Sequence, residues 1–121
     1  MRHKILVVDD EVEICRLLQA FLTKKGFEVS TATGGQQALE ELKKEKDIDL
    51  LILDIMMPTM TGPEVLRQME KESLNIPVIV LTGSLSDASF LKEYSLVKNT
   101  EIKPMDLNTL FEDISKILKA S

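Results

Sequence analysis

Five short apolar runs alternate with longer segments of helical period, and this alternation constrains the fold more than any other feature of the sequence. Three of the runs are continuously hydrophobic, as parallel strands are when helices cover both faces of their sheet. Strict alternation of strand and helix predicts an α/β fold with an open parallel sheet and right-handed crossovers. The periodicity leaves the order of the strands open. The expected strands are residues 5–8, 27–32, 50–53, 78–81 and 96–102.

Helix boundary signals accompany the segments between and after these runs. Gly26 follows the first segment, Pro63 opens the third and Asp106 precedes the last, as expected of a stop, a first-turn proline and an N-cap. Ser86 or Asp87 can cap the fourth segment. The expected helices are residues 11–25, 36–46, 63–72, 86–94 and 106–118.

The bulk composition excludes several classes of protein. The 121 residues suffice for one domain, residues 1–121, and we expect no output domain after it. A net charge of −5 without a Lys/Arg cluster argues against direct nucleic-acid binding. No secretory signal or membrane-length apolar stretch is present, and the single cysteine, Cys15, excludes an internal disulfide. We therefore expect a cytoplasmic protein without a membrane partner, in which Cys15 is a packed thiol.

Polar side chains follow four of the five apolar runs. In an open α/β sheet, ligands bind at the carboxyl ends of the strands, so these side chains belong to one edge. Each alone has an ordinary role as a cap, a turn residue or a solvated lysine. Their joint occurrence at one edge favours a shared site. The residues are Asp9 and Asp10, Asp54, Thr82 and Lys103.

The chemistry of this set is specific. Three converging carboxylates would attract a hard divalent cation, and Mg²⁺ is the natural candidate because it prefers oxygen ligands and keeps several waters. A lysine adds a further positive charge and a threonine adds a hydroxyl donor. A carboxylate nucleophile, Mg²⁺, lysine and hydroxyl are the parts that phosphoryl transfer requires.

The chain resembles the receiver domains of two-component response regulators from end to end. The matching motifs are ILVVDDE (5–11), LLILDIMMPTMTG (50–62), PVIVLTG (77–83) and IKPM (102–105). The resemblance implies a flavodoxin-like, doubly wound five-stranded parallel sheet in the order 2-1-3-4-5 with five helices. It also implies a phosphoryl donor, which is a sensor histidine kinase, a phosphotransfer protein or an acyl phosphate.

The same resemblance assigns roles to single residues. It makes Asp54 the phosphoacceptor, Asp10 a direct metal ligand and Asp9 mainly a water-mediated one. The backbone carbonyl of Met56 would complete the protein ligands of the Mg²⁺.

Two further residues would handle the phosphoryl group. Lys103 would pair with it and Thr82 would bond it once attached, and the peptide before Pro104 would be cis. Such a domain catalyses only its own phosphorylation and slow hydrolysis, so it is a signalling switch, not an enzyme. A downstream output domain or protein would read its state.

Two rival functions use the same fold. A haloacid-dehalogenase-like phosphohydrolase also has a strand-end Asp, Mg²⁺, Thr and Lys, but it needs an acid two residues after the nucleophile, where this chain has Met56. A non-phosphorylated interaction module would not need an intact set of acidic residues, threonine and lysine. Turnover of a generic phosphatase substrate would support the first rival, and no phosphate uptake with Mg²⁺ would support the second.

Some residues depart from the family pattern or lie outside the predicted site. Thr100 replaces an aromatic residue on the last strand, which leaves open how output is signalled. Thr61 stands at a usually acidic turn position, where we expect little effect. His3 is expected on the surface. Gly34-Gly35 is expected to form a flexible turn. The loop methionines Met56, Met57 and Met60 are expected to pack.

Overall fold

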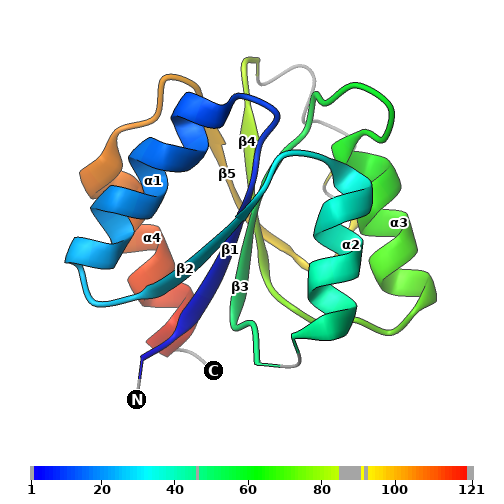
Figure 1. The fold of residues 1–121 in the computed structure, drawn as a ribbon, viewed down its shortest axis with the longest axis horizontal. Coiled ribbons are helices and arrows are strands. Elements are labelled where there is room, and N and C mark those ends of the chain that lie inside the picture. Colours follow the sequence, from blue (N-terminus) through cyan, green and yellow to red (C-terminus); the bar gives the residue numbers. More distant parts are fainter. Residues whose placement is uncertain (1, 46, 85–90, 92, 120–121) are drawn as a thin grey trace.

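A five-stranded parallel sheet lies between two layers of helices in the computed structural model, which describes residues 2–45, 47–84, 91 and 93–119 (Figure 1). The strand order β2-β1-β3-β4-β5 confirms the order that the resemblance implies, and all four pairings are parallel. The strands are β1 (Lys4–Val8), β2 (Glu28–Ala32), β3 (Leu50–Asp54), β4 (Val78–Thr82) and β5 (Val97–Ile102).

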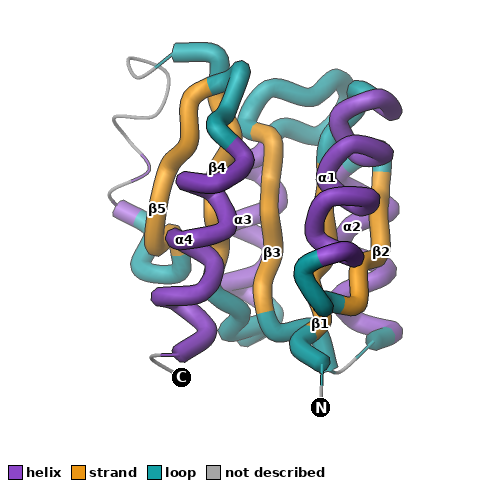
Figure 2. The backbone as a smooth tube through the Cα atoms, turned by 90° about the vertical axis from the view of Figure 1, so that its left-hand side faces the viewer, coloured by secondary structure: helices purple, strands orange, loops and turns teal. Residues whose placement is uncertain are grey.

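Helices α1 and α4 cover one face of the sheet, and α2 and α3 cover the other (Figures 1 and 2). The described residues contain four α-helices and not the expected five, because most of the helix expected over 86–94 falls outside them. No helix in the described part of the chain is long and apolar enough to cross a membrane. The helices are α1 (Val12–Lys24), α2 (Gly35–Lys44), α3 (Gly62–Lys71) and α4 (Leu107–Lys119).

The central strands explain the continuous apolar runs in the sequence. All five residues of β3 and of β4 are buried, because both faces of these strands are covered. Alternate side chains enter different cores: Leu6 and Val8 pack toward α2 and α3, whereas Ile5 and Val7 pack toward α1 and α4. Each fully buried aliphatic side chain contributes about 1.5–3 kcal/mol. The sheet is therefore a rigid support for whatever its carboxyl edge holds.

Local signals set the helix ends. Gly26 follows α1 with φ +98°, a conformation that favours glycine. Asp106 accepts hydrogen bonds from two amides of the first turn of α4, at 2.9 and 3.1 Å, which confirms the predicted cap. Thr61 is the N-cap of α3: its hydroxyl accepts the Glu64 amide at 3.4 Å and donates to the Glu64 carboxylate at 3.2 Å.

Two helix-starting glycines are required by close packing. A Cβ on Gly35 would lie 2.8 Å from Cγ of Met60 and 2.9 Å from Cγ2 of Val65, so this glycine is a contact point and not the expected flexible turn. A Cβ on Gly62 would lie 2.7 Å from the Ile55 Cα. Without a Cβ at these two positions, the loop after β3 can pack closely against the starts of α2 and α3.

Candidate functional site

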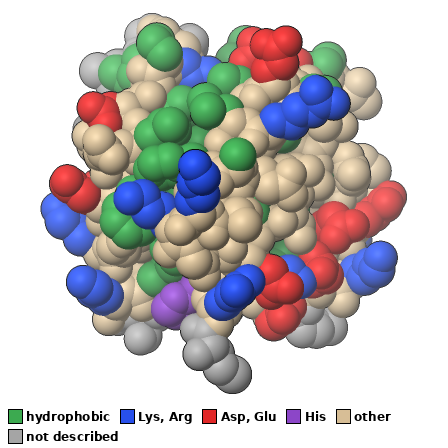
Figure 3. Space-filling model, turned by 60° about the vertical axis from the view of Figure 1, so that its left-hand side comes forward, with side chains coloured by type: hydrophobic (Ala, Val, Ile, Leu, Met, Phe, Trp, Pro, Cys, Tyr) green, Lys and Arg blue, Asp and Glu red, His purple; other side chains and the backbone are tan. Residues whose placement is uncertain are grey.

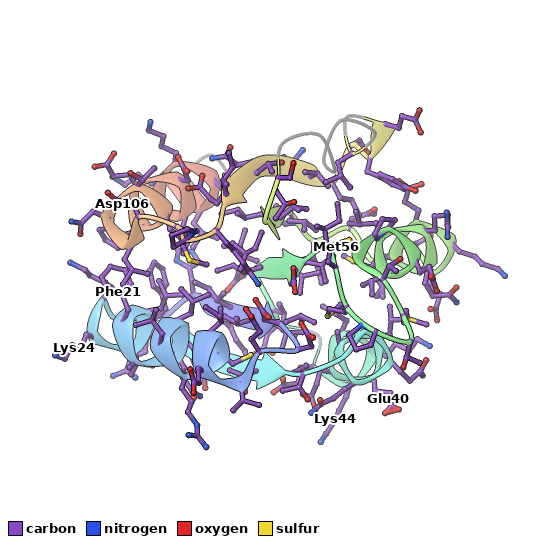
Figure 4. The ribbon with its side chains drawn as sticks, turned by 90° about the horizontal axis from the view of Figure 1, so that it is seen from above. Phe21, Lys24, Glu40, Lys44, Met56 and Asp106 are labelled. Carbon is purple, nitrogen blue, oxygen red and sulfur yellow. The ribbon has the colours of Figure 1, made fainter. Side chains whose placement is uncertain are left out.

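The carboxyl ends of β1, β3, β4 and β5 meet at one edge of the sheet, seen from above in Figure 4. Asp9 follows β1, Asp54 ends β3, Thr82 ends β4 and Lys103 follows β5. Asp9, Asp54 and Thr82 are the buried polar side chains among the described residues, with 0%, 3% and 0% of their surface exposed. Polar groups buried at the end of an otherwise apolar sheet indicate a site.

Three carboxylates converge at this edge. One oxygen each from Asp9, Asp10 and Asp54 lies within 4.8 Å of the others, with Asp9 and Asp54 buried and Asp10 exposed. The Met56 amide donates to Oδ1 of Asp54 at 3.3 Å. A hard divalent cation with oxygen ligands suits such a donor set, because its charge offsets the repulsion among the acids.

Lys103 reaches into the same cluster. Its Nζ lies 2.7 Å from Oδ2 of Asp9, 3.2 Å from Oε2 of Glu11 and 3.5 Å from Oδ2 of Asp54. Burial alone would lower the pKa of Lys103, but the adjoining carboxylates, Asp9 foremost, raise it above its ordinary value. The ammonium therefore stays charged at neutral pH. The peptide between Lys103 and Pro104 is cis, as the resemblance implies.

Asp54 has an unusual protonation equilibrium. Burial raises the pKa of its carboxyl to about 6, and the negative charge of Asp9 acts in the same direction. Lys103 and the Met56 amide oppose this rise without cancelling it. The site therefore holds more negative charge than its one ammonium can balance.

The Thr82 hydroxyl forms a small turn at the edge of the site. It donates to the Ser84 carbonyl at 3.0 Å and accepts from the Ser84 amide at 3.2 Å. It is held at the end of a fully buried strand, so its position is fixed while its hydroxyl can rotate.

The loop after β3 differs from the expectation for its methionines. Met57 is buried and Met60 packs against the core, which confirms the prediction for these two. Met56 is 64% exposed, so the prediction was wrong there, and Figure 4 shows it beside the end of β3. Its backbone amide is bonded to Asp54 while its side chain faces solvent. Thr59 has φ +69°, a strained value for a β-branched residue.

Other sequence predictions fall outside the site. Cys15 is buried, its thiol donates to the Asp9 carbonyl at 3.3 Å, and burial raises its pKa, which confirms a packed thiol. His3 is exposed just before β1, at the opposite end of the sheet. Thr100 is half-buried on β5 opposite Val80.

Sequence reasoning missed Glu11. Its side chain is at the start of α1, yet it pairs with a lysine 92 residues later. The signal in the sequence is only a third acid after the Asp9-Asp10 pair, and no periodicity predicts the contact.

The family model described as response regulator receiver domain matches residues 5–115. The chain belongs to this family. The receiver domain is 37% identical over 124 residues to the alkaline phosphatase synthesis transcriptional regulatory protein PhoP of Bacillus subtilis, with all of this chain and 50% of PhoP covered. It is 34% identical to the response regulator SaeR of Staphylococcus aureus, with 85% of this chain and 44% of SaeR covered. The chain thus spans about half the length of these curated relatives.

Solved receiver-domain structures have the same fold. The response regulator TrrA of Thermotoga maritima, in complex with Mg²⁺ and BeF, is 34% identical with a TM-score of 0.86, covering 96% of this chain and 99% of TrrA. A response regulator receiver domain protein of Clostridium thermocellum is 30% identical with a TM-score of 0.88, covering 98% and 95%.

Proposed function

We propose that this receiver domain is a phosphorylation-activated signalling switch in which Asp54 accepts the phosphoryl group. The observation that carries the proposal is a buried strand-end carboxylate with two further acids within 4.8 Å and the Lys103 ammonium at 3.5 Å. A sensor histidine kinase or a phosphotransfer protein is the donor, and acyl phosphates serve as small-molecule donors. The receiver domain is then switched by a charge added at a rigid sheet edge.

Asp9, Asp10, Asp54 and the Met56 backbone carbonyl would hold Mg²⁺. The cation supplies charge neutralisation for the acids and for the incoming phosphoryl oxygens. The converging oxygens support this assignment, as does the 34% identity to TrrA, whose structure is a complex with Mg²⁺ and BeF.

Two side chains act on the phosphoryl group in this proposal. Lys103 pairs its ammonium with a phosphoryl oxygen in place of Asp54. The Thr82 hydroxyl rotates from the Ser84 carbonyl and donates to another oxygen. In both cases a contact with the phosphoryl group replaces a contact of the unphosphorylated state. Phosphorylation can therefore shift the equilibrium between two conformations of the receiver domain.

The chain lacks the general acid that a phosphohydrolase of the haloacid-dehalogenase type has two residues after its nucleophile. Met56, two residues after the nucleophile, cannot act as a general acid. The receiver domain is accordingly proposed to catalyse its own phosphorylation and hydrolysis, and an output domain or protein reads the result.

The donor protein is proposed to dock on exposed apolar side chains of α1 and of the loop after β3. Val12 and Leu17 of α1 are 49% and 47% exposed, and Met56 is the most exposed large apolar residue described. Figure 3 shows apolar side chains at the surface on the α1 and α4 side. Nucleic acid is not proposed as a partner of these residues. PhoP is named a transcriptional regulatory protein, and we place any DNA contact of such relatives in the half that this chain does not cover.

Incubation with acetyl phosphate and Mg²⁺ tests the proposal. Intact-mass measurement should find one added phosphoryl unit in the wild type and none in Asp54→Asn or after chelation of the metal. Asp47→Asn, an exposed acid at the other end of the sheet, is the matched control and should be phosphorylated normally. Equal mass gain in Asp54→Asn would refute the assignment.

The docking surface has its own test. Leu17→Glu places a charge among the exposed apolar side chains of α1, so transfer from a phosphorylated donor protein should slow about tenfold, as for a moderate interface residue. Phosphorylation by acetyl phosphate should not change, because Leu17 does not line the carboxylate cluster. An equal loss with both donors would show damage to the site instead.

A further inference from the structure

We propose that Glu11 is a positioning residue that holds the Lys103 ammonium while Mg²⁺ takes the carboxylates of Asp9 and Asp54. This inference rests on the proposed metal and phosphoacceptor site. It assigns a role to a residue that the site as described leaves without one.

The geometry links Glu11 to both ends of the site. Its backbone amide donates to Oδ1 of Asp9 at 2.9 Å, while its carboxylate accepts a hydrogen bond from Lys103 Nζ at 3.2 Å. The other carboxylates of the cluster are buried or face the metal position, whereas the Glu11 side chain is 61% exposed. Glu11 therefore touches the site without belonging to its metal ligands.

The helix does not explain the choice of residue. Glu11 is the N-cap of α1, but its side chain makes no capping hydrogen bond. Ser, Thr, Asp and Asn are the effective caps, because their short side chains reach the first-turn amides. A glutamate here leaves its carboxylate available for the lysine across the site.

Lys103 and a divalent cation compete for the same carboxylates. The ammonium lies 2.7 Å from Asp9 and 3.5 Å from Asp54, and these acids also supply two of the three converging oxygens. When a doubly charged ion binds these acids, its charge weakens their attraction for the Lys103 ammonium. The ion also repels the ammonium directly. Such effects are strong at a site shielded from water.

Glu11 resolves this competition. An ammonium has three donor hydrogens, so it can release Asp9 and Asp54 and keep its bond to Glu11. It then remains beside the site, where a phosphoryl oxygen can meet it. Without the Glu11 charge, Lys103 keeps its hold on Asp9 and opposes the metal. The loss of Glu11 should therefore weaken Mg²⁺ binding, and the weakening should require Lys103.

Calorimetric titration with Mg²⁺ alone tests this coupling. Glu11→Gln should lower Mg²⁺ affinity about 3- to 10-fold, in the range for residues of one charge network. In a Lys103→Met background, Glu11→Gln should change the affinity less than about twofold. The matched control is Glu13→Gln, which removes the same charge from an exposed residue that pairs with no described residue. Melting curves in chelator check that every variant is folded.

The outcomes separate the inference from the proposed function. If Glu11→Gln weakens Mg²⁺ binding equally with and without Lys103, or no more than Glu13→Gln does, Glu11 acts only as a distant charge and the positioning role is overturned. If it strengthens binding, the role is also overturned. In each case, wild-type Mg²⁺ binding leaves the proposed function standing. A wild-type receiver domain that binds no Mg²⁺ overturns both.

Discussion

Two lysines lie at opposite ends of the same sheet, each among several acids, and they behave differently. Lys4 opens β1, and its ammonium pairs with Glu45 and, at 3.7 Å, with Asp47. Its amide donates to Asp49 at 2.8 Å. All three acids come from the connection between α2 and β3. The acids around Lys103 come instead from the ends of β1 and β3 and the start of α1.

The difference shows how a structural ion pair differs from a reactive one. The hydrogen bond from Lys4 holds the pKa of Glu45 below its usual value, so both members of that pair are ionised at neutral pH. Asp54 has a raised pKa, because burial and the Asp9 charge outweigh what Lys103 offers. A perturbed pKa at a buried, charged site marks Asp54 as a candidate functional residue.

The largest expected contrast is between the two lysines in phosphorylation. Lys103→Met should slow phosphorylation of Asp54 by acetyl phosphate about 100-fold, because it removes a cation aimed at developing charge. Lys4→Met should change this rate by less than about twofold, since it alters neither ground-state nor transition-state contacts. A time course of intact mass at saturating Mg²⁺ measures both. An equal loss of phosphorylation rate in the two variants would show that Lys103 has no special role in the reaction.

Asp54→Asn should stabilise the metal-free receiver domain. The pKa of Asp54 is raised from 3.8 to about 6, so the folded state holds its proton longer than the unfolded state does. Stability therefore falls as the pH rises from about 4 to 6 and stays reduced above that range. The variant removes the loss and should gain about 1–3 kcal/mol at pH 7. Urea unfolding in chelator at pH 4 and pH 7 measures it, and an equal gain at both pH values would contradict the explanation.

Much of the fold and of the candidate site could be predicted from the sequence. Strand-end residues Asp9, Asp54, Thr82 and Lys103 converge because parallel strands share one carboxyl edge, so topology alone brings them together. The bounds of the five strands and of the four described helices agree with the predicted ones within a few residues. The central strands were the clearest, since buried parallel strands are continuously apolar.

What the sequence could not predict depends on contacts between distant elements. The Glu11–Lys103 pair joins residues 92 positions apart, and no local pattern encodes it. Gly35 reads as a turn residue, although its role is to admit the side chains of Met60 and Val65. Met56 is apolar but exposed, and its apolar side chain gave no sign of this. Each depends on exact packing and not on composition.

Mg²⁺ should stabilise the fold by binding at the end of the sheet where one ammonium leaves negative charge unbalanced. At ten times the dissociation constant, binding to the native state alone contributes about 1.4 kcal/mol. Wild type and Lys4→Met should show the same rise in melting temperature with Mg²⁺, and Asp10→Ala should show none. Differential scanning calorimetry across a Mg²⁺ series measures this, with Ca²⁺ as a comparison. A wild-type melting temperature indifferent to millimolar Mg²⁺ would count against a metal site.

The smallest expected effect on stability belongs to the Lys4–Glu45 pair. Its contribution to stability rises with pH, whereas that of Asp54 falls. The pKa of Glu45 is lowered from 4.5 by Lys4, so the pair stabilises the fold above about pH 4.5 and loses that contribution as the pH falls through the lowered pKa. Glu45→Gln should therefore destabilise at pH 7, by less than about 1 kcal/mol because the pair is partly exposed. The deficit should shrink on acidification, whereas the gain of Asp54→Asn should grow from pH 4 to 6. Unfolding curves of both variants over one pH series make the test, and parallel slopes would mean that the two ends of the sheet do not differ as their charges indicate.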